Sequence, residues 1–385
     1  MMQLQKKFPS FISMVTGDPR LYGLINSELV SVMKEVVTNA PFMYPSASGL
    51  VERFKETVAN FEYGKRGVKY ESEKIIPTTG LASALYLLQS AVLKPGDEIA
   101  LFTPNHYFFG PSNQVEAVGA SLRSIETYEE DGWLPRPEKL REAMSIKTRF
   151  LMVVNPQNPL GVVYPERTLK EICDIAAEFS VPVISDEIYG LITYDGTNAH
   201  STAKFAGENL VLTLSGASKI FFATGLRVGY ICPHGGTKKN QVFLESLKKT
   251  ASLFGQTSSG IATPILAALI EMYSNRMHSV DIAINELQRR RDFAVKQINE
   301  IEGISMIPPL GALYTFPKIA DLKGFADDYE FLYALARDEN VGLLPGSLFG
   351  DTGGNHVRGL ILPDVSVQTE AYERIRRFLK RSRVT

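Results

Sequence analysis

The most informative stretch of this sequence is residues 218–229, which read SKIFFATGLRVG. Lys219 follows a strand-like segment and stands eight positions before Arg227, in a glycine-bearing loop that is otherwise apolar. Apolar surroundings disfavour the charged form of an amine, so a lysine in such a loop is a candidate nucleophile. A snorkelling surface lysine is the alternative for an isolated Ser-Lys pair, and the rest of the sequence has to decide between the two.

Short apolar runs recur along the chain and are typical of buried strands. They cover residues 75–76, 98–103, 121–125, 150–154, 181–185, 210–214 and 228–232. Helix-length amphipathic stretches, such as residues 81–93 and 169–179, separate most of these runs. The alternation predicts an α/β fold in which helices sandwich a mostly parallel, seven-stranded sheet.

The last part of the chain has a different pattern. Residues 241–300 favour long helices that break at residues 255–260. Strand-like and helical segments then alternate irregularly, at residues 304–307, 312–316, 329–338, 341–344, 360–362 and 369–381. We therefore predict a smaller α+β domain that packs beside the first.

Composition limits the class of protein. The 385 residues suit two domains, and the net charge of −1 provides no overall field for nucleic acid or anionic lipid. Cys173 and Cys232 are too few for a disulfide framework or a Cys-based zinc site. We find no convincing signal peptide and no apolar run long enough to cross a bilayer. The sequence thus predicts a cytoplasmic protein that binds neither membrane nor nucleic acid.

Several common motifs are absent from the sequence. It contains no G-x-x-x-x-G-K-[ST], no H-E-x-x-H, and no G-x-G-x-x-G after a strand. Polar residues instead follow the predicted strands, where open α/β sheets bind their ligands.

Three further segments accompany the lysine loop. They read NPQNPLG at residues 155–161, SDEIY at residues 185–189 and GNHVR at residues 354–358. Together, in this order, the four segments resemble the motifs of the class I and II aminotransferases, which are fold-type I enzymes dependent on pyridoxal 5′-phosphate (PLP). The resemblance covers the chain from about Gly17 to Arg358.

The resemblance implies a homodimeric enzyme that moves an amino group between an L-amino acid and a 2-oxo acid by a ping-pong mechanism. It divides the chain into a large PLP-binding domain, residues 42–285, and a small domain formed by residues 1–41 and 286–385. Lyases and cyclases share this fold, so elimination or replacement chemistry stays open as the alternative. A PLP-binding regulator or a non-catalytic scaffold is the alternative from a different class.

The resemblance also assigns the catalytic residues. Lys219 carries PLP as a Schiff base and moves the substrate proton. Asp186 faces the pyridine nitrogen and keeps it protonated, while Asn158 and Tyr189 donate hydrogen bonds to the ring oxygen. Taken alone, Asp186 also fits a helix N-cap and Asn158 a turn residue.

The phosphate group of PLP has its own expected contacts. They are the backbone at Gly80, Leu81 and Ala82, where a helix begins, together with the side chains of Ser218 and Arg227. The family often has a hydroxyl three positions before the lysine, but this chain has Gly216 there. That contact is therefore missing or comes from Ser215.

Substrate residues are implied as well. Arg358 is expected to bind the substrate α-carboxylate as a bidentate fork, with Gly17 and Asn158 beside it. Arg20, close to Gly17 in sequence, is either a solvent-exposed turn residue or a contact for a distal carboxylate. The sequence does not identify the amino donor.

Two aromatic positions complete the expected site. His106 stands two positions after a proline, where the family has the residue that stacks on the PLP ring. Tyr107 is the rival for this place, and we favour His106. Tyr44 resembles the tyrosine that reaches the phosphate of the partner subunit.

Overall fold

The computed structural model describes residues 10–39, 47–109, 112–257, 261–275 and 277–381. Its centre is a seven-stranded sheet of order β2-β8-β7-β6-β5-β3-β4. The strands are β2 (Ile76–Thr78), β3 (Glu98–Thr103), β4 (Ser121–Glu126), β5 (Thr148–Val154), β6 (Val183–Asp186), β7 (Val211–Gly216) and β8 (Gly229–His234). Only β8 runs antiparallel to its neighbours, which confirms the predicted sheet and its mostly parallel character.

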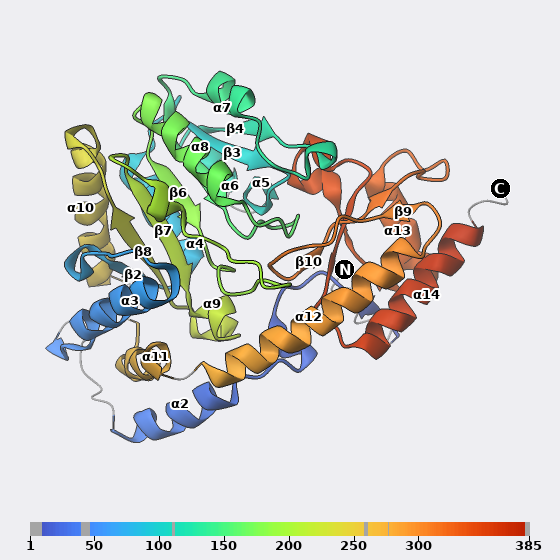
Figure 1. Ribbon diagram of the computed structural model, residues 1–385, viewed down its shortest axis with the longest axis horizontal. Helices are drawn as coiled ribbons and strands as arrows, with labels where there is room; N and C mark the ends of the chain where they lie inside the picture. The colour runs from blue at the N-terminus through green and yellow to red at the C-terminus, as the bar shows by residue number, and fades with distance from the viewer. Residues whose placement is uncertain (1–9, 40–46, 110–111, 258–260, 276, 382–385) are drawn as a thin grey trace.

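Helices cover both faces of this sheet, which is why the inner strands are almost continuously apolar (Figure 1). One face carries α4 (Leu81–Val92), α6 (Ser112–Ala117) and α10 (Gln241–Thr257). The other carries α3 (Leu50–Arg66), α8 (Glu166–Glu178) and α11 (Thr263–Asn275), and α2 (Ser27–Asn39) packs on α11. Two short helices, α5 (His106–Phe109) and α9 (Ala217–Ile220), follow β3 and β7, and α7 (Pro137–Ala143) contacts β4 and α8. Each face therefore has its own apolar core.

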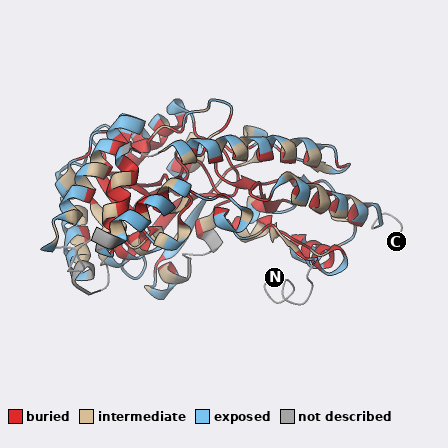
Figure 2. Ribbon diagram, turned by 90° about the horizontal axis from the view of Figure 1, so that it is seen from below, coloured by how far each residue is buried: buried red, intermediate tan, exposed pale blue. Residues whose placement is uncertain are grey.

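A smaller set of strands and helices forms the second part of the molecule. Its strands are β1 (Ile12–Ser13), β9 (Ile304–Ser305), β10 (Tyr314–Thr315), β11 (Lys318–Ile319), β12 (Val341–Gly342), β13 (Leu344–Pro345) and β14 (Val357–Leu360). The strand β1 pairs with β12, so a segment from near the N-terminus joins the C-terminal part of the chain. The helices α12 (His278–Asn299), α13 (Asp328–Glu339) and α14 (Val365–Arg381) cover these strands, and Figure 2 shows their exposed outer faces.

The domain limits remain a proposal. The junction expected at residues 285/286 lies inside α12, which runs without a break from one part of the molecule to the other. The junction expected at residues 41/42 lies outside the described residues.

Two sequence predictions were wrong in detail. The last strand was expected at residues 360–362, but β14 covers Val357–Leu360. Its start was missed because Arg358, a charged residue buried in the strand, interrupts the apolar pattern. The helix break was expected from Gly255, but α10 continues to Thr257. A glycine costs a helix only about 1 kcal/mol, which a long helix tolerates. Within the described ranges, we find no helix both long and apolar enough for a bilayer.

Candidate active site

The site lies at the carboxyl ends of the central strands. Asp186 is the last residue of β6, and Asn158 stands in the loop after β5. Lys219 lies in α9, directly after β7. Neighbouring parallel strands end at the same sheet edge, so this fold gathers the three side chains at the usual ligand position.

Lys219 is half-buried, and its Nζ donates a hydrogen bond to the carbonyl oxygen of Gly17. The two residues are 202 positions apart. A Cβ added to Gly17 would lie 2.9 Å from the hydroxyl of Tyr314, so only a glycine fits here without displacing that ring. The structure thus brings the N-terminal segment to the lysine, while the expected contact of Gly17 with the substrate stays a prediction.

Asp186 is buried and accepts two hydrogen bonds. Its Oδ2 accepts from the Tyr107 hydroxyl at 2.6 Å, and its Oδ1 accepts from the amide of Ile188 at 3.0 Å. Burial raises the pKa of Asp186 to about 6, although both hydrogen bonds oppose this rise. Among the described residues no lysine or arginine forms an ion pair with Asp186. A protonated pyridine nitrogen is the kind of cation that such a carboxylate suits, so Asp186 fits PLP.

His106 and Tyr107 are neighbours in α5, and their rings stack on each other with centroids 4.8 Å apart and an interplanar angle of 11°. Tyr107 packs among Leu85, Val115 and other residues of the core beneath α4. His106 is half-buried, and its pKa falls to about 4 because of burial and the charges of Arg358 and Lys219. Within this stacked pair, Tyr107 is the ring whose hydroxyl reaches Asp186. The stacking of His106 on the PLP ring stays a prediction.

Tyr189 forms a hydroxyl pair with a residue that the sequence did not single out. Its hydroxyl oxygen lies 2.7 Å from that of Tyr314 in β10, and both side chains are buried. Burial, and then Tyr314, raise the pKa of Tyr189 well above its usual value. In the sequence Tyr314 looks like an ordinary core residue of the predicted strand 312–316, and no local signal separates it from its neighbours.

Arg358 is a buried cation held by neutral groups. Its Nη2 donates to the carbonyl oxygen of Val15 at 2.9 Å, and Nη1 lies 3.4 Å from Oδ1 of Asn158. The guanidinium sits 4.8 Å from the ring centre of Tyr314 and 5.1 Å from that of Phe349. Burial lowers the pKa of Arg358, and its Nε has no hydrogen-bond partner. In the described part of the chain no carboxylate pairs with this arginine, so the group suits an anionic substrate.

Two close glycine contacts lie where the phosphate site was expected. Gly80 has φ +82° directly before α4, and a Cβ there would lie 2.8 Å from Nη2 of Arg227. A Cβ on Gly229 would lie 3.0 Å from the carbonyl carbon of Gly80. Leu81 and Ala82 begin α4, and the exposed Arg227 lies beside Gly80 at the start of this helix. Helix amides and a guanidinium placed so close together suit an anion. Ser218 stands next to the lysine in α9.

The packing around Gly216 explains why this chain has a glycine where the family often has a hydroxyl residue. A Cβ there would lie 2.4 Å from the carbonyl oxygen of Val228, so β8 leaves no room for a hydroxyl side chain. Ser215 cannot replace it, because strand alternation places Ser215 with Thr213 on the sheet face opposite α4. The suggestion that Ser215 contacts the phosphate was therefore wrong.

Of two other expected residues, one is not described and one lies apart from this site. Tyr44 falls outside the described residues. Arg20 is exposed in the short 3-10 helix Pro19–Tyr22 and lines a separate hollow of about 650 Å³, beside Lys34 and Phe222. That hollow is bordered by neither Lys219 nor Arg358.

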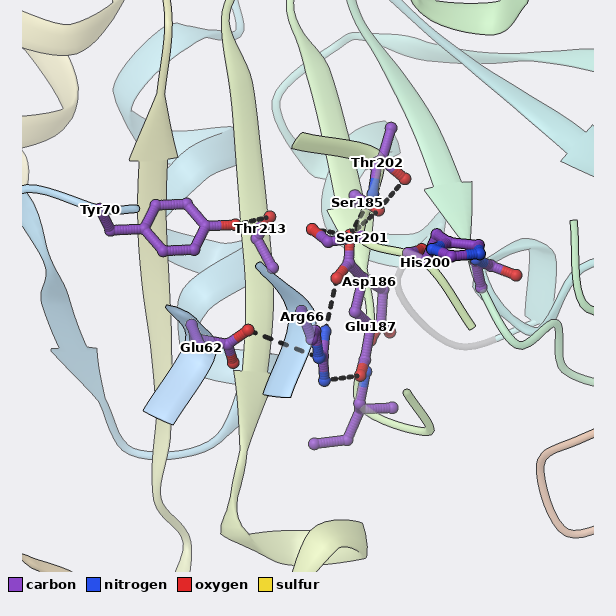
Figure 3. Close-up of polar contacts among 12 residues, drawn as sticks. Glu62, Arg66, Tyr70, Ser185, Asp186, Glu187, His200, Ser201, Thr202 and Thr213 are labelled. Carbon is purple, nitrogen blue, oxygen red and sulfur yellow. Dashed lines mark hydrogen bonds and ion pairs between the residues drawn. The ribbon is translucent and has the colours of Figure 1, made fainter. Parts of the chain in front are cut away.

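A buried polar network lies behind the site and was not anticipated (Figure 3). Arg66, at the end of α3, pairs with Glu187 at 2.5 Å and with Glu62 at 3.4 Å. Its Nη2 also donates to the carbonyl oxygen of Glu187 at 3.3 Å and lies 2.5 Å from where a Cβ of Gly190 would be. Oε1 of Glu187 accepts from the Ser185 hydroxyl, the Ser201 hydroxyl and the Thr202 amide. The network thus holds the turn that carries Tyr189.

Comparisons with known proteins agree with this geometry. Residues 29–361 match the family "Aminotransferase class I and II". An aspartate aminotransferase of Bacillus subtilis is 29% identical over 88% of this chain and 84% of its own. A glutamate–pyruvate aminotransferase of Haemophilus influenzae is 28% identical over 98% of this chain and 93% of its own.

Solved structures give the same result. An alanine aminotransferase from Pyrococcus furiosus has a TM-score of 0.90 and 31% identity, covering 99% of this chain and 95% of its own. An aspartate aminotransferase from Thermus thermophilus, solved with maleate, has a TM-score of 0.86 and 27% identity, covering 98% of this chain and 94% of its own. All four are named aminotransferases, which does not favour the lyase or cyclase alternative. The chain belongs to the class I and II aminotransferase family and is a PLP-dependent transaminase.

Proposed function

We propose that Lys219 binds PLP covalently, as a Schiff base, and that the enzyme moves an amino group between an L-amino acid and a 2-oxo acid in two half-reactions. The observation that carries this proposal is that Lys219 and Asp186 lie at the ends of neighbouring strands, while Tyr314 lies between Arg358 and Gly17, the residue that Lys219 contacts. When bound, PLP supplies an electron sink for the negative charge that forms at the substrate α-carbon.

The protein groups divide the remaining work. The Lys219 amine removes the α-proton and returns it, and the Gly17 carbonyl holds this amine in place. Asp186 keeps a proton on the ring nitrogen. Arg358 binds the α-carboxylate as a fork, because its Nε and Nη1 have no strong partner in the described structure.

The ring oxygen has two proposed donors. Oδ1 of Asn158 faces Arg358, which leaves the Nδ2 of the same amide to donate toward the ring. Tyr189 supplies the second donor. We further propose that the neutral imidazole of His106 covers one face of the ring, since a charged one would repel a pyridinium.

The phosphate would lie in the cradle between α4 and the lysine loop. Its proposed partners are Gly80, Leu81, Ala82, Ser218 and Arg227. Tyr44 of a second subunit is proposed to complete this site, which makes the enzyme a homodimer. The buried, unpaired thiols of both cysteines are consistent with a cytoplasmic location.

The first test uses Lys219→Ala with Lys204→Ala as its control, since Lys204 lies on the surface and pairs with Glu166. Wild type and control should show a pH-dependent PLP absorbance and yield a single labelled peptide, containing Lys219, after borohydride reduction. Lys219→Ala should fold but lose both signals and all turnover. Turnover near the wild-type rate in this variant would overturn the assignment.

The second test separates transamination from elimination. Without a 2-oxo acid, a transaminase converts one equivalent of amino donor per site to its oxo acid and then stops. Aspartate, glutamate and alanine are the first donors to offer, because the relatives above are named for them or for their oxo acids. Continuous release of ammonia would instead support the lyase alternative.

A further inference from the structure

We propose that Tyr314 is a positioning residue that directs the hydroxyl proton of Tyr189 toward the ring oxygen of PLP and fixes the face of Arg358. This inference rests on the proposed function, because it assumes that PLP binds at Lys219. In this proposal a residue of β10, outside the central sheet, influences the protonation of the cofactor.

The backbone holds Tyr314 firmly in place. Tyr314 lies in β10 and pairs with Leu360 of β14, the strand that also carries Arg358. The turn before it is fixed by two bonds to Ala312, whose amide donates to Ile192 and whose carbonyl oxygen accepts from Tyr194 at 2.6 Å. The ring is only 4% exposed. Its position is therefore set by the fold before any ligand arrives.

Tyr314 touches three groups of the site at once. Its hydroxyl lies 2.7 Å from that of Tyr189, and the same hydroxyl occupies the space beside Gly17. Its ring face lies 4.8 Å below the guanidinium of Arg358. A cation over an aromatic face is attracted by the ring quadrupole, so the ring fixes the plane of the carboxylate fork.

The hydroxyl pair has two possible directions of donation. A phenol has one proton to donate and two lone pairs that accept. If Tyr189 gave its proton to Tyr314, it could not donate to the ring oxygen. If Tyr314 donates instead, the Tyr189 proton points outward and the chain of two hydroxyls ends on the ring oxygen.

A negatively charged ring oxygen selects the second direction. Successive hydrogen bonds of one direction polarise each other, so donation from Tyr314 makes Tyr189 a stronger donor. A stronger donor withdraws charge from the ring oxygen, which then holds the proton shared with the Lys219 nitrogen less tightly. Tyr314 should therefore lower the pH midpoint of the cofactor's absorbance change.

The test compares Tyr314→Phe with Tyr314→Leu. The Phe variant keeps the ring under Arg358 and loses only the hydroxyl. We expect its absorbance midpoint to rise by about half to one pH unit, the size expected for losing one buried hydrogen bond, with KM for the amino donor unchanged. The Leu variant should show the same rise and also a KM at least about tenfold higher, because the guanidinium loses its aromatic support.

Tyr70→Phe is the matched control. Tyr70 is also buried, and its hydroxyl donates to another hydroxyl, that of Thr213, at 2.8 Å. Its loss should leave the absorbance midpoint unchanged. An equal shift in Tyr70→Phe, or no shift in Tyr314→Phe, would overturn the inference.

A double variant tests the route of the effect. Since Tyr314 acts through Tyr189, the variant with both tyrosines changed to Phe should have the midpoint of Tyr189→Phe alone. Additive shifts would show an independent action and would contradict the proposal. If the wild type itself gives no pH-dependent PLP absorbance, the proposed function fails, which is a different outcome from an unchanged midpoint in Tyr314→Phe.

Discussion

Arg66→Met should destabilise the enzyme strongly, although Arg66 is not among the proposed ligand-binding residues. The guanidinium is the single cation in the network of Figure 3, and it faces the carboxylates of Glu187 and Glu62. Methionine fills most of the same volume without charge. The variant therefore leaves two carboxylates buried without a cation in that network.

The geometry sets the size of the effect. The side chains of Arg66 and Glu187 are 2% and 1% exposed, so water cannot replace the lost partner. Removing one partner of a buried ion pair costs about 3–5 kcal/mol. With an unfolding entropy of about 2.1 cal/mol/K per residue over 385 residues, a loss of about 4 kcal/mol lowers Tm by about 5 °C.

The effect should depend on pH in a defined direction. Burial already raises the pKa of Glu187 above its ordinary value of 4.5, and Arg66 opposes this rise. Without Arg66 the pKa of Glu187 rises further, so above pH 4.5 the folded variant holds a proton that the unfolded chain has lost. The free energy of unfolding of Arg66→Met should therefore recover as the pH falls from 8 toward about 5.

Urea unfolding at pH 8 and at about pH 5.5 measures this recovery. Arg141→Met is the control, because Arg141 pairs with Glu178 at 3.0 Å but the two side chains are 48% and 49% exposed, and its Tm should not change measurably. Adding Glu187→Gln to Arg66→Met should restore part of the loss. The reasoning is refuted if Arg66→Met costs no more than Arg141→Met, or if its deficit grows as the pH falls.

Three further changes have defined outcomes. Asp186→Asn should keep PLP bound but lower kcat by about 100- to 1,000-fold, because the ring nitrogen loses its fixed charge partner; steady-state kinetics and the cofactor spectrum check this together. In His106→Phe, the free energy of unfolding should fall less between pH 6.5 and about pH 4 than in wild type. Because burial lowers the pKa of His106 to about 4, the folded wild type binds fewer protons than the unfolded chain across that window and loses stability as the pH falls. Urea unfolding measures this, and equal slopes in the two proteins would refute it. Gly80→Ala should weaken PLP binding at least about tenfold in equilibrium dialysis, because a Cβ would displace Arg227 and a φ of +82° strains any residue other than glycine. Unchanged affinity would show that the phosphate does not bind at Gly80.

The sheet could be predicted because its signal is local. Each central strand is apolar on both faces, and helix-length stretches separate most of the strands, so the sequence pattern alone indicates the layers. The positions of Lys219 and Asp186 at the ends of neighbouring strands could be predicted for a similar reason, whereas their roles come from the family resemblance and stay predictions.

The supporting residues could not be predicted, because their signal is not local. Arg66 meets Glu187 across 121 positions of the sequence. Within its own helix Arg66 stands four residues after Glu62, which looks like an ordinary exposed i,i+4 pair. Tyr314 meets Tyr189 across 125 positions and has the appearance of a core tyrosine. Such contacts depend on how the elements pack, which periodicity does not encode.

Two acidic residues at the end of β6, Asp186 and Glu187, show how a buried charge with a charged partner differs from one without. Asp186 and Glu187 are adjacent and buried, but strand alternation turns them to opposite faces of the sheet. Glu187 meets the cation of Arg66, whereas Asp186 meets only neutral donors. The two buried arginines divide in the same way, since Arg66 faces carboxylates and Arg358 faces carbonyl, amide and aromatic groups. A buried charge is costly without a counter-charge. We therefore propose that Asp186 and Arg358, which have no charged partner among the described residues, are the groups that meet a cationic ring and an anionic substrate.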